Sequence, residues 1–532
     1  MRQQTVLITG ASDGIGLALA RSYAASGARV FGVGRRSALD VEPGLRGGYC
    51  RVDLAQPFAA AVVSEFLRRR AVQALDLLIH CAGVGAYGPI VAQAPGTIDA
   101  LLDTNLRAPI ALTHALLPAL ARASGRVVFI GSVAAALPVP DYAVYGATKA
   151  ALEGFARSLR VELRGRVGVQ VIHPGATRTG MHAKSGAPLE RVGWSHFPRP
   201  ERVARRIVRA IAGGVPVVTI GLGNRLLRLS GRHLRGVADR FAVARQARMP
   251  GAPRAFSPPP ATCSRRHCVV TGGADGIGRA VAERFARAGF AVTIVDRDAE
   301  RAARLCQALR GAGGVAGWIH VDLAQAGAVA VTLRHLAALP PADVVVHSAG
   351  ISAVGRFAEG AIARQAVVLD VNLRAPVQLT AGMLCGGLVA PGATLVFIAS
   401  LSVFTGYPGA AVYAASKDGL AAYARSLRAA LAPQGVHVLT VYPGPTRTAH
   451  ARRYSPDNRR ERRRMPPERL AELLAGAVER REPELVPGPA NRLIAAVGRL
   501  APALTEALMH RAILDRLPQT GVLAGQTLER QP

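Results

Sequence analysis

The sequence predicts two α/β units joined end to end, each a doubly wound parallel sheet with a helical extension at its C-terminus. Three observations predict this fold class: the length of 532 residues, an internal repeat, and short β-branched runs that alternate with longer helical patterns. A chain of this length is long for one domain and comfortable for two. Because 50% of the residues are hydrophobic, each half can bury a core of its own.

Motifs of the first half return in the second half in the same order and at a nearly constant offset. The segment TVLITGASDGIG at 5–16 returns as HCVVTGGADGIG at 267–278, and DTNLRAPIALT at 103–113 returns as DVNLRAPVQLT at 370–380. Two further pairs follow: YGATKAALEGFARSLR (145–160) with YAASKDGLAAYARSLR (413–428), and HPGATRT (173–179) with YPGPTRT (442–448). A repeat of this extent indicates two copies of one unit.

The repeat sets the expected domain bounds. We place the first domain at 1–249 and the second at 267–532. Between them, the stretch 250–266 is rich in proline and small residues, which is typical of a linker.

Strand patterns alternate with helix patterns inside each half. In the first half we expect strands near 5–9, 29–33, 76–80, 126–131 and 167–172. Helices fall between them, for example over 16–26 and 143–164. This alternation predicts a parallel sheet covered by helices on both faces. Ligands of such sheets bind at the carboxyl ends of the strands, so we expect the site there.

The formal net charge of +32 raises the question of nucleic-acid binding. The charge is spread over the whole chain and comes almost entirely from arginine, so we do not expect a nucleic-acid partner. Only three lysines occur: Lys149, Lys184 and Lys417. In an arginine-rich chain these positions become informative.

Other function classes are not expected from the composition. The segment before the first strand is too short for a signal sequence, and no run of about eighteen apolar residues predicts a membrane span. The 6 cysteines are scattered without metal-ligand spacing. We therefore expect a reduced, cytoplasmic protein without a metal site.

A glycine-rich turn follows the first strand of each half and opens a helix. Glycine permits a tight turn and close backbone approach, and the helix N-terminus supplies N–H groups to a pyrophosphate. The residues expected to hold a dinucleotide are Gly10, Ser12, Gly14, Ile15 and Gly16 in the first half, and Gly272, Gly276, Ile277 and Gly278 in the second.

The tip of the second strand indicates which dinucleotide each half binds. An acidic side chain there accepts hydrogen bonds from the ribose 2′-OH, whereas arginine accommodates a 2′-phosphate. The first half ends this strand with Arg35 and Arg36, which predicts NADP(H), unless these residues only reflect the arginine content. The second half ends it with Asp296 and Arg297, which predicts NAD(H). Contacts with the adenine ring are expected from Asp53 and Asp322.

A tyrosine and a lysine lie four residues apart at the start of a helix in both halves. They are Tyr145 with Lys149 and Tyr413 with Lys417, and residues at this spacing share a helix face. Carbonyl reduction needs a proton donor at the oxygen while hydride reaches the carbon. A nearby ammonium is expected to lower the tyrosine pKa from its usual value near 10. Two of the three lysines serve these positions, which favours chemistry over a solvated helix face.

A serine precedes each tyrosine by thirteen residues, at the end of a strand. Ser132 follows VVFI and Ser400 follows LVFI with one intervening residue each. A hydroxyl at the carboxyl end of a strand can hold the substrate carbonyl oxygen beside the tyrosine. Because the same distance occurs in both halves, we expect these serines to have a role in the site and not to be ordinary strand-end residues.

These motifs, in this order, resemble the short-chain dehydrogenase/reductase family over essentially the whole of both halves. The resemblance implies a Rossmann fold and a Ser–Tyr–Lys site. It also implies a supporting asparagine, Asn105 or Asn372, which in the family helps to place a water in a proton relay with the lysine. The PGxxxT segments imply contacts with the nicotinamide end from Pro174, Gly175, Thr179, Pro443, Gly444 and Thr448.

The chain departs from the family pattern after the fourth strand. The family often has N-A-G there, whereas this chain has Cys81 and Ser348 in place of the asparagine. The small pairs that let the cofactor approach remain, namely Ala82 with Gly83 and Ala349 with Gly350. We expect the loss of the asparagine side chain to affect the local support of the sheet and not the chemistry of the site.

The segments after PGxxxT, where the family usually places a substrate lid, differ between the halves. In the first half, 180–200 contains Met181, Trp194 and Phe197, which suits an apolar substrate. In the second, 451–464 is densely basic. It could receive an acyl-carrier protein, a CoA phosphate or an anionic lipid head, or be a solvated loop.

Each half continues past the expected end of the fold. The segments 224–245 and 491–517 resemble basic amphipathic helices that could cap the substrate pocket, lie on a membrane surface, or pack on the other half. They are similar to extensions of 3-ketosphinganine reductases within the family, which points toward long-chain, lipid-like substrates.

The leading hypothesis is an oxidoreductase that interconverts ketones and secondary alcohols and is bifunctional. If the first half uses NADPH and the second NAD⁺, the two could invert a stereocentre. Alternatives are one catalytic half with a structural pseudo-dimer partner, or a nucleotide-sensing module. The oligomeric state beyond an internal pair is left open, including a homo-oligomer.

Overall fold

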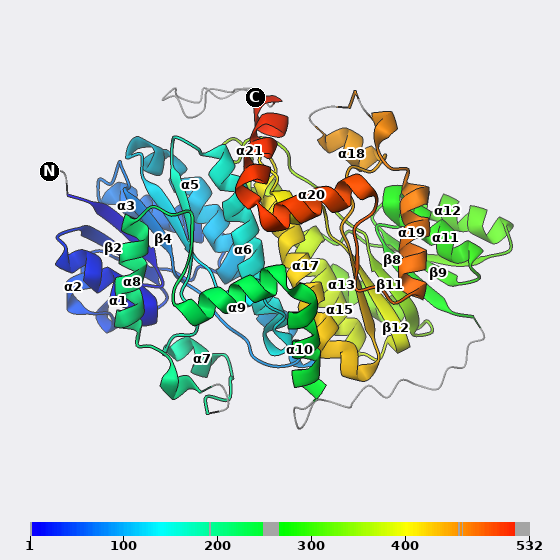
Figure 1. Cartoon of the computed structure of the whole chain (residues 1–532), viewed down its shortest axis with the longest axis horizontal. Coiled ribbons are helices and arrows are strands. Elements are labelled where there is room, and N and C mark those ends of the chain that lie inside the picture. The colour runs from blue at the N-terminus through cyan, green and yellow to red at the C-terminus, as the bar shows by residue number, and fades with distance from the viewer. Residues whose placement is uncertain (1–2, 191–192, 248–264, 456–457, 460, 517–532) are drawn as a thin grey trace.

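The fold was analysed in a computed structural model, which describes residues 3–190, 193–247, 265–455, 458–459 and 461–516. Most of the expected linker 250–266 lies outside the described residues. On either side of it the chain forms one seven-stranded parallel sheet, in the orders β3-β2-β1-β4-β5-β6-β7 and β10-β9-β8-β11-β12-β13-β14 (Figure 1). The predicted pair of doubly wound sheets is confirmed.

The strands of the first sheet are β1 (Thr5–Thr9), β2 (Arg29–Gly34), β3 (Tyr49–Arg51), β4 (Leu77–His80), β5 (Arg126–Ile130), β6 (Gly168–His173) and β7 (Val217–Thr219). Those of the second are β8 (His267–Thr271), β9 (Ala291–Asp296), β10 (Val315–His320), β11 (Ala342–His347), β12 (Val389–Ile398), β13 (His437–Val441) and β14 (Glu484–Leu485). All five expected strands of the first half are present. The edge strands β3 and β7 have three residues each, too few to show a period.

The helices of the first half are α1 (Gly14–Ala25), α2 (Pro43–Arg46), α3 (Ala59–Arg69), α4 (Pro95–Leu102), α5 (Ala108–Arg122), α6 (Ala143–Glu162), α7 (Gly180–Lys184), α8 (Pro200–Ala212), α9 (Leu222–His233) and α10 (Arg235–Ala247). Those of the second are α11 (Gly276–Arg287), α12 (Ala299–Gly311), α13 (Ala328–Leu336), α14 (Ile362–Leu369), α15 (Ala375–Cys385), α16 (Ser402–Thr405), α17 (Ala411–Leu431), α18 (Ala449–Tyr454), α19 (Pro467–Glu479), α20 (Pro489–Leu500) and α21 (Pro502–Ile513). Among the described residues, no helix is long and apolar enough to cross a membrane.

Alternating side chains of the central strands enter different cores. In β1, Val6 and Ile8 join the cluster formed with α1 and α8, whereas Leu7 joins the cluster on the opposite face with α5 and α6. This follows from the two-residue period of a strand. Both faces are therefore buried, as the continuous apolar runs require.

The strand order reverses between β1 and β4 in the first sheet, and between β8 and β11 in the second. Such a switch point opens a crevice at the carboxyl ends of the two strands, where ligands of this fold class bind. The glycine-rich turns follow β1 and β8, so the topology places them at these crevices.

Helices α6 and α17 pack directly against each other and join the two halves. One continuous apolar cluster spans both sides, with the rings of Phe155 and Phe357 5.1 Å apart. Gly154 allows the close approach, because a Cβ there would lie 1.8 Å from a carboxylate oxygen of Asp418. That carboxylate pairs with Arg157 across the interface at 2.7 Å.

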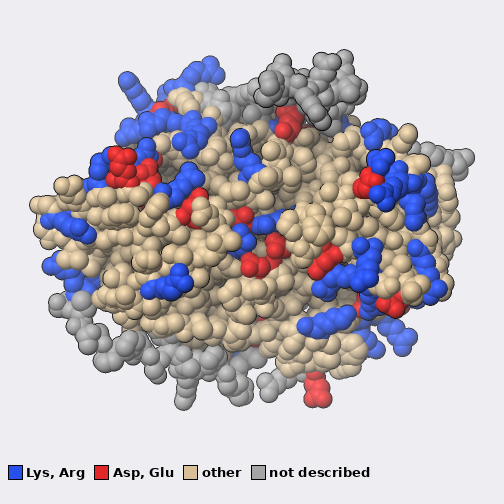
Figure 2. Space-filling view, turned by 180° about the vertical axis from the view of Figure 1, so that it is seen from behind, with Lys and Arg blue, Asp and Glu red and all other residues tan. Residues whose placement is uncertain are grey.

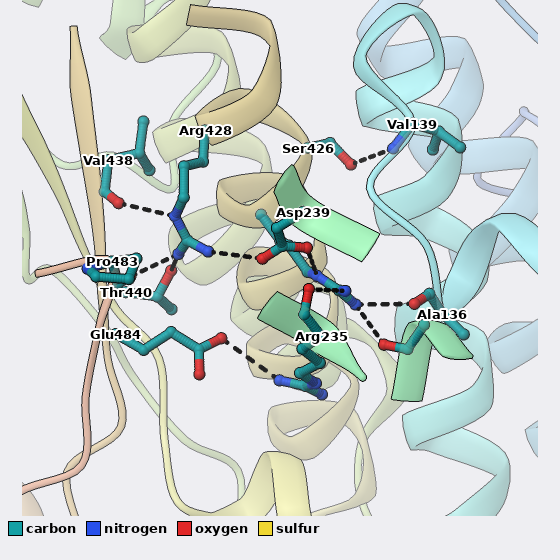
Figure 3. A network of polar contacts seen from close by, with 12 residues as sticks. Ala136, Val139, Arg235, Asp239, Ser426, Arg428, Val438, Thr440, Pro483 and Glu484 are labelled. Atoms are coloured by element: carbon teal, nitrogen blue, oxygen red, sulfur yellow. Dashed lines mark hydrogen bonds and ion pairs between the residues drawn. The ribbon is translucent and has the colours of Figure 1, made fainter. Parts of the chain in front are cut away.

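The C-terminal extension of each half packs on the other half (Figure 1). Asp239 of α10 lies between Arg425 and Arg428 of α17, at 2.6 and 3.2 Å (Figure 3). In the same way Glu506 of α21 pairs with Arg160 of α6. Of the three possibilities for these helices, the structure shows packing on the other half.

Basic side chains occur in several separate groups on the face shown in Figure 2, with acidic side chains among them. The distribution matches the spread of arginine along the sequence. Not all arginines lie on the surface. Arg425 and Arg428 are in the interface between the halves, where only 8% and 14% of their side chains are exposed.

The interface pair makes a stability prediction. Arg157→Ala leaves the buried Asp418 carboxylate without its partner and should lower the free energy of unfolding by about 3 kcal/mol at about pH 8. Burial raises the pKa of Asp418 to about 7. Because the folded state holds this proton more tightly, the stability that Asp418 contributes is present at low pH and is lost as pH rises through about 7. The loss caused by Arg157→Ala should therefore shrink at about pH 5.5.

Urea unfolding at the two pH values measures this difference. Arg279→Ala is the control, since its pair with Glu283 is on the surface, with 58% of the arginine side chain exposed, and should change stability little. Equal losses in the two variants, or a loss independent of pH, would contradict the prediction.

Candidate active site

The glycine-rich turn of the first half is a cradle that larger residues would fill. Gly10 has φ +72°, and a Cβ there would lie 2.8 Å from the Ala82 Cα. A Cβ on Gly16 would lie 2.2 Å from the Gly10 carbonyl oxygen. Both contacts are too close for any side chain, so the turn must present bare backbone at the start of α1. This is the surface that a pyrophosphate needs.

The second half repeats this geometry closely. A Cβ on Gly272 would lie 2.7 Å from the Ala349 Cα, and one on Gly278 would lie 2.1 Å from the Gly272 oxygen. Gly14 and Gly276 also have positive φ, +53° and +56°. Ile15 and Ile277 begin α1 and α11 next to these glycines, and Ser12 lies within the first turn. The residues present thus fit a dinucleotide in both halves.

A threonine hydroxyl of the neighbouring strand holds the loop after β4. The Thr9 Oγ1 accepts hydrogen bonds from the backbone N–H groups of Cys81 and Ala82, both at 3.1 Å. In the second half Thr271 Oγ1 accepts from the Ala349 N–H at 3.2 Å. The loops that carry Cys81 and Ser348 are therefore hydrogen-bonded to the neighbouring strand.

The tips of β2 and β9 differ in structure as they do in sequence. Arg36 donates to the Ser12 carbonyl at 3.0 Å and pairs with Asp13 at 3.1 Å, which holds it over the glycine-rich turn. Arg35 is exposed beside it. In the second half Asp296 accepts from the Ala274 N–H at 2.9 Å, so a carboxylate lies at the corresponding edge.

The two aspartates expected at the adenine ring have local partners. Asp53 Oδ1 accepts from the Ala55 N–H at 3.1 Å and Asp322 Oδ1 accepts from the Ala324 N–H at 3.0 Å. Each therefore closes a turn after the third strand. Asp322 and Arg297 both line the second-half cleft described below.

Tyrosine, lysine and serine come together in each half at the carboxyl end of the sheet. In the first, the Lys149 ammonium donates to the Ile130 carbonyl at 3.1 Å and lies 5.8 Å from the centre of the Tyr145 ring. Ser132 follows β5 and faces the tyrosine, where its hydroxyl lowers the tyrosine pKa. The three side chains thus border one space.

The second half places the same groups with nearly the same distances. Lys417 donates to the Ile398 carbonyl at 2.9 Å and lies 5.8 Å from the Tyr413 ring centre. Ser400 lowers the pKa of Tyr413. The two halves therefore share one arrangement of these groups.

Burial governs the pKa values of these groups. It raises the pKa of Tyr145 to about 12 and also raises the pKa of Tyr413. Hydrogen bonds with the serine hydroxyls lower both pKa values in part. It lowers the pKa of Lys149 and of Lys417 to about 8. The expected lowering of the tyrosine pKa by the lysine is therefore not seen in this structure. The cost of burying a phenolate outweighs an ammonium that is itself buried and held by a carbonyl.

The asparagines tie the loop after β4 to the catalytic helix. The Asn105 side chain accepts from the Val84 N–H and donates to the Val84 carbonyl, both at 2.9 Å, and donates to Thr148 beside Lys149 at 3.2 Å. Asn372 makes the matching contacts with Ile351 and Ser416. Both asparagines lie in a π-helical turn.

The PGxxxT segments close over the cradle. The side chain of Thr179 would be 3.0 Å from a Cβ on Gly14, and that of Thr448 would be 3.2 Å from one on Gly276. Pro174 and Gly175 follow β6, and Pro443 and Gly444 follow β13, so these residues reach the same edge as the catalytic groups.

Sequence reasoning missed two asparagines that pack on these segments. A Cβ on Gly175 would lie 2.1 Å from Asn224 Nδ2, and one on Gly444 would lie 2.5 Å from Asn491 Oδ1. Asn224 and Asn491 come from the extension helices α9 and α20. The tripeptide NRL that both share is the signal that could have identified them.

A cleft of about 1640 Å³ contains the second catalytic set. Its acidic lining residues, Asp275, Asp296, Asp298 and Asp322, lie at the glycine-rich end. Its substrate end includes the arginines Arg453, Arg459, Arg462, Arg463, Arg464 and Arg469. Met509 and Ile513 of α21 also line it, so the extension covers the pocket as well as packing on the first half.

The first half covers its catalytic set with a less basic segment. Trp194 Nε1 donates to the Thr179 carbonyl at 3.4 Å, and the rings of His182 and Phe197 are 5.4 Å apart. Met181 reaches toward Gly85 beside the site. In the part of the chain that the structure describes, no group of three His, Cys, Asp or Glu side chains could hold a metal ion.

Two known proteins of one organism are similar to this chain in sequence. The uncharacterized short-chain type dehydrogenase/reductase y4eK of Sinorhizobium fredii is 35% identical over 218 residues, which cover 40% of this chain and 86% of that protein. A second such protein of that organism, y4vI, is 28% identical over 477 residues and covers 85% of this chain and 82% of its own length. The alignment with y4vI thus runs through both halves.

A solved structure is also similar to one half of the chain. It is described as a putative NAD(P) dependent gluconate 5-dehydrogenase from Beutenbergia cavernae with bound NADP at low occupancy. It has 32% sequence identity and a TM-score of 0.38, and the match covers 42% of this chain and 94% of that one.

The family model described as short chain dehydrogenase matches the chain twice, at residues 4–190 and 266–459. Each match contains one glycine-rich cradle and one Ser–Tyr–Lys set. The chain therefore belongs to the short-chain dehydrogenase/reductase family, as a tandem of two such units, and is an NAD(P)-dependent oxidoreductase.

Proposed function

We propose that both halves interconvert ketones and secondary alcohols. The observation that carries this proposal is the matching Ser–Tyr–Lys arrangement beside a nucleotide cradle in each half. A reduced nicotinamide, when bound, supplies hydride to the carbonyl carbon. The tyrosine hydroxyl gives its proton to the carbonyl oxygen, which the serine hydroxyl holds in place. The reverse reaction moves the same proton back to the tyrosine.

The lysine takes part in this proton transfer through its contact with the tyrosine. With a pKa near 8, its ammonium can share protons with a buried phenol more readily than an exposed lysine. It is fixed by a backbone carbonyl, and the neighbouring Asn105 or Asn372 holds the loop that borders it. A proton relay through the lysine to solvent is the role that the family resemblance implies for this set.

We further propose that the first half uses NADP(H) and the second NAD(H). Arg36 above the glycine-rich turn, with Arg35 beside it, offers positive charge to a 2′-phosphate. Asp296 offers a carboxylate to a ribose 2′-OH and would repel a phosphate. With different cofactors, one half could oxidise an alcohol while the other reduces the ketone, so that the chain inverts a stereocentre.

The substrate ends suggest apolar substrates, with an anionic group in the second half. Met181, Trp194 and Phe197 favour an apolar chain in the first half. In the second, arginines at the cleft favour a phosphate or carboxylate, as carried by a CoA thioester, an acyl-carrier protein or a lipid head, and α21 favours a lipid-like chain. Peripheral contact with a membrane would fit such substrates.

A second candidate is that one half is a structural partner for a single catalytic half. The extensive packing of α6 on α17 favours it, because a fused pair could imitate a family dimer. Both Ser–Tyr–Lys sets are complete, which favours two active halves.

Phenylalanine at either catalytic tyrosine separates these candidates. Tyr145→Phe should lower the NADPH-linked kcat by about 10²-fold or more, the usual contribution of a general acid, and leave the NADH-linked activity unchanged. Tyr413→Phe should do the reverse. Initial rates with NADPH and NADH on 2-octanone, ethyl acetoacetate and acetoacetyl-CoA measure both. Loss of every activity in one variant and none in the other would identify a single catalytic half.

The cofactor assignment makes a separate prediction. Arg36→Ala should weaken NADPH binding by about tenfold, the equivalent of about 1.4 kcal/mol, because it removes a cation from the 2′-phosphate. Asp296→Asn should strengthen NADPH binding relative to NADH in the second half. Because only one half turns over in each of the Tyr145→Phe and Tyr413→Phe backgrounds, the KM for NADPH and for NADH in these backgrounds reports the two sites separately. Equal preference in both halves would remove the basis for stereoinversion.

The arginines of the second cleft predict selectivity for anionic substrates. Arg462→Gln with Arg463→Gln should raise the KM for acetoacetyl-CoA by about tenfold, the equivalent of about 1.4 kcal/mol, because both side chains are exposed and each exposed charge pair contributes only up to about 1 kcal/mol. The KM for the neutral ethyl acetoacetate should stay the same. A parallel change for both substrates would argue that these arginines are a solvated surface.

A further inference from the structure

Two loops form a wall of the second-half cleft. One follows β11 and runs from 351 to 357, and the other precedes α17 and runs from 405 to 410. Gly406 and Tyr407 line the cleft, and the Tyr407 ring lies 6.1 Å from the ring of Tyr413. The Gly355 N–H donates to the Gly409 carbonyl at 2.9 Å and links the loops. Their position therefore decides what lies beside the catalytic tyrosine.

A carboxylate from the first half holds both loops. Glu162 is the last residue of α6, and its Oε2 accepts from the Phe357 N–H at 2.8 Å. Its Oε1 accepts from the Gly409 N–H at 2.7 Å. One turn earlier, Ser158 Oγ accepts from the Tyr407 N–H at 3.1 Å. Each carboxylate oxygen thus accepts a hydrogen bond from one of the two loops. Hydrogen bonds to an ionised acceptor are stronger than those between neutral groups.

The placement of this acid has a physical cost. Burial raises the pKa of Glu162 to about 7, against which the two backbone N–H groups and Arg356 act, while Glu359 adds to the rise. A buried carboxylate needs such partners to remain in place. Gly409 has φ +79°, a backbone conformation that glycine adopts readily and residues with a side chain rarely adopt.

The contact runs in one direction only. Ser426, which matches Ser158, accepts from the Val139 N–H of the first half at 3.2 Å. The link between the loops also has a match, since the Gly88 N–H donates to the Asp141 carbonyl at 2.9 Å. The position that matches Glu162 is Ala430, which has no side chain to accept a hydrogen bond. The first-half loops thus lack this clamp.

We propose that Glu162 is a positioning residue for the second active site, supplied by the first half of the chain. It holds the loops that place Tyr407 beside Tyr413 and that form the wall of the substrate space. The role rests on the proposed function, since it requires the second cleft to be catalytic. It makes the second site dependent on a carboxylate of the first half, a contact that the first site lacks because the matching residue is Ala430.

Hydrogen–deuterium exchange on the full chain tests the clamp without any substrate. In Glu162→Ala, amides of 351–357 and 405–410 should exchange at least about tenfold faster, because their bonded partner is gone. The amides of 84–90 and 136–141 should not change. Glu162→Gln keeps one carbonyl oxygen and should fall between. Faster exchange over the whole chain, or none in these loops, would overturn the proposal.

Ser426→Ala is the matched control, since it removes the reciprocal contact and should affect only the first-half loop at 136–141. If Glu162→Ala does not fold, Glu162→Gln and Ser158→Ala carry the comparison, with Ser158→Ala loosening 405–410 alone. Unchanged exchange in both of these variants would equally overturn the proposal.

Kinetics then separate positioning from general destabilisation. With NADH and acetoacetyl-CoA, Glu162→Ala should raise KM roughly tenfold with kcat changed by less than about twofold, the signature of lost binding shared by ground and transition states. The NADPH-linked reaction should be unchanged in the same protein. Equal effects on both reactions would overturn the proposal. If the wild type shows no NADH-linked turnover, the proposed function fails, while the exchange experiment still decides whether Glu162 holds the loops.

Discussion

The packing of α6 against α17 is the contact on which the rest of the structure depends. Each helix carries a catalytic tyrosine and lysine near its start and presents small residues to the other helix. Gly154 leaves room for Asp418, which a Cβ would displace. Because the two helices share this buried surface, each catalytic set is built on a helix whose other side is covered by the opposite half. Neither half has this core complete by itself.

The extensions secure the same arrangement from outside. Asp239 and Glu506 occupy matching positions on α10 and α21, and each pairs with an arginine of the opposite catalytic helix. Arg425 also donates to the carbonyls of Ala136 and Gly231 in the first half. Such buried arginines are expensive to desolvate and gain from several partners at once. The extension helices therefore bind the two halves and, through α21, cover the second cleft.

The halves keep one chemistry and differ around it. The cradle and the Ser–Tyr–Lys set repeat within a few tenths of an ångström in the measured contacts. The strand tips carry Arg36 in one half and Asp296 in the other, the cover segment of the second half is the more basic one, and Glu162 of the first half corresponds to Ala430 of the second. This division is the physical basis of the proposals that the two sites share a reaction and differ in cofactor and substrate.

The sequence by itself determined the features that depend on short spacings along the chain. The glycine turn, the four-residue interval from Tyr145 to Lys149 and the buried strands have local geometry, so their patterns could be interpreted without a fold. The repeat fixed the number of units for the same reason. The edge strands β3 and β7 were not predicted, because three residues are too few to show a hydrophobic period.

Only the tertiary structure decided contacts between residues far apart in the chain. Thr9 supporting Ala82, Asn224 packed on Gly175, and Glu162 reaching Gly409 arise from the crossing of elements, and no local pattern encodes them. The tyrosine pKa belongs to the same group, because burial raises it and burial is set by the surrounding fold. Spacing along the chain identified the groups that we propose do the chemistry, and three-dimensional packing determined which of them hold each other in place.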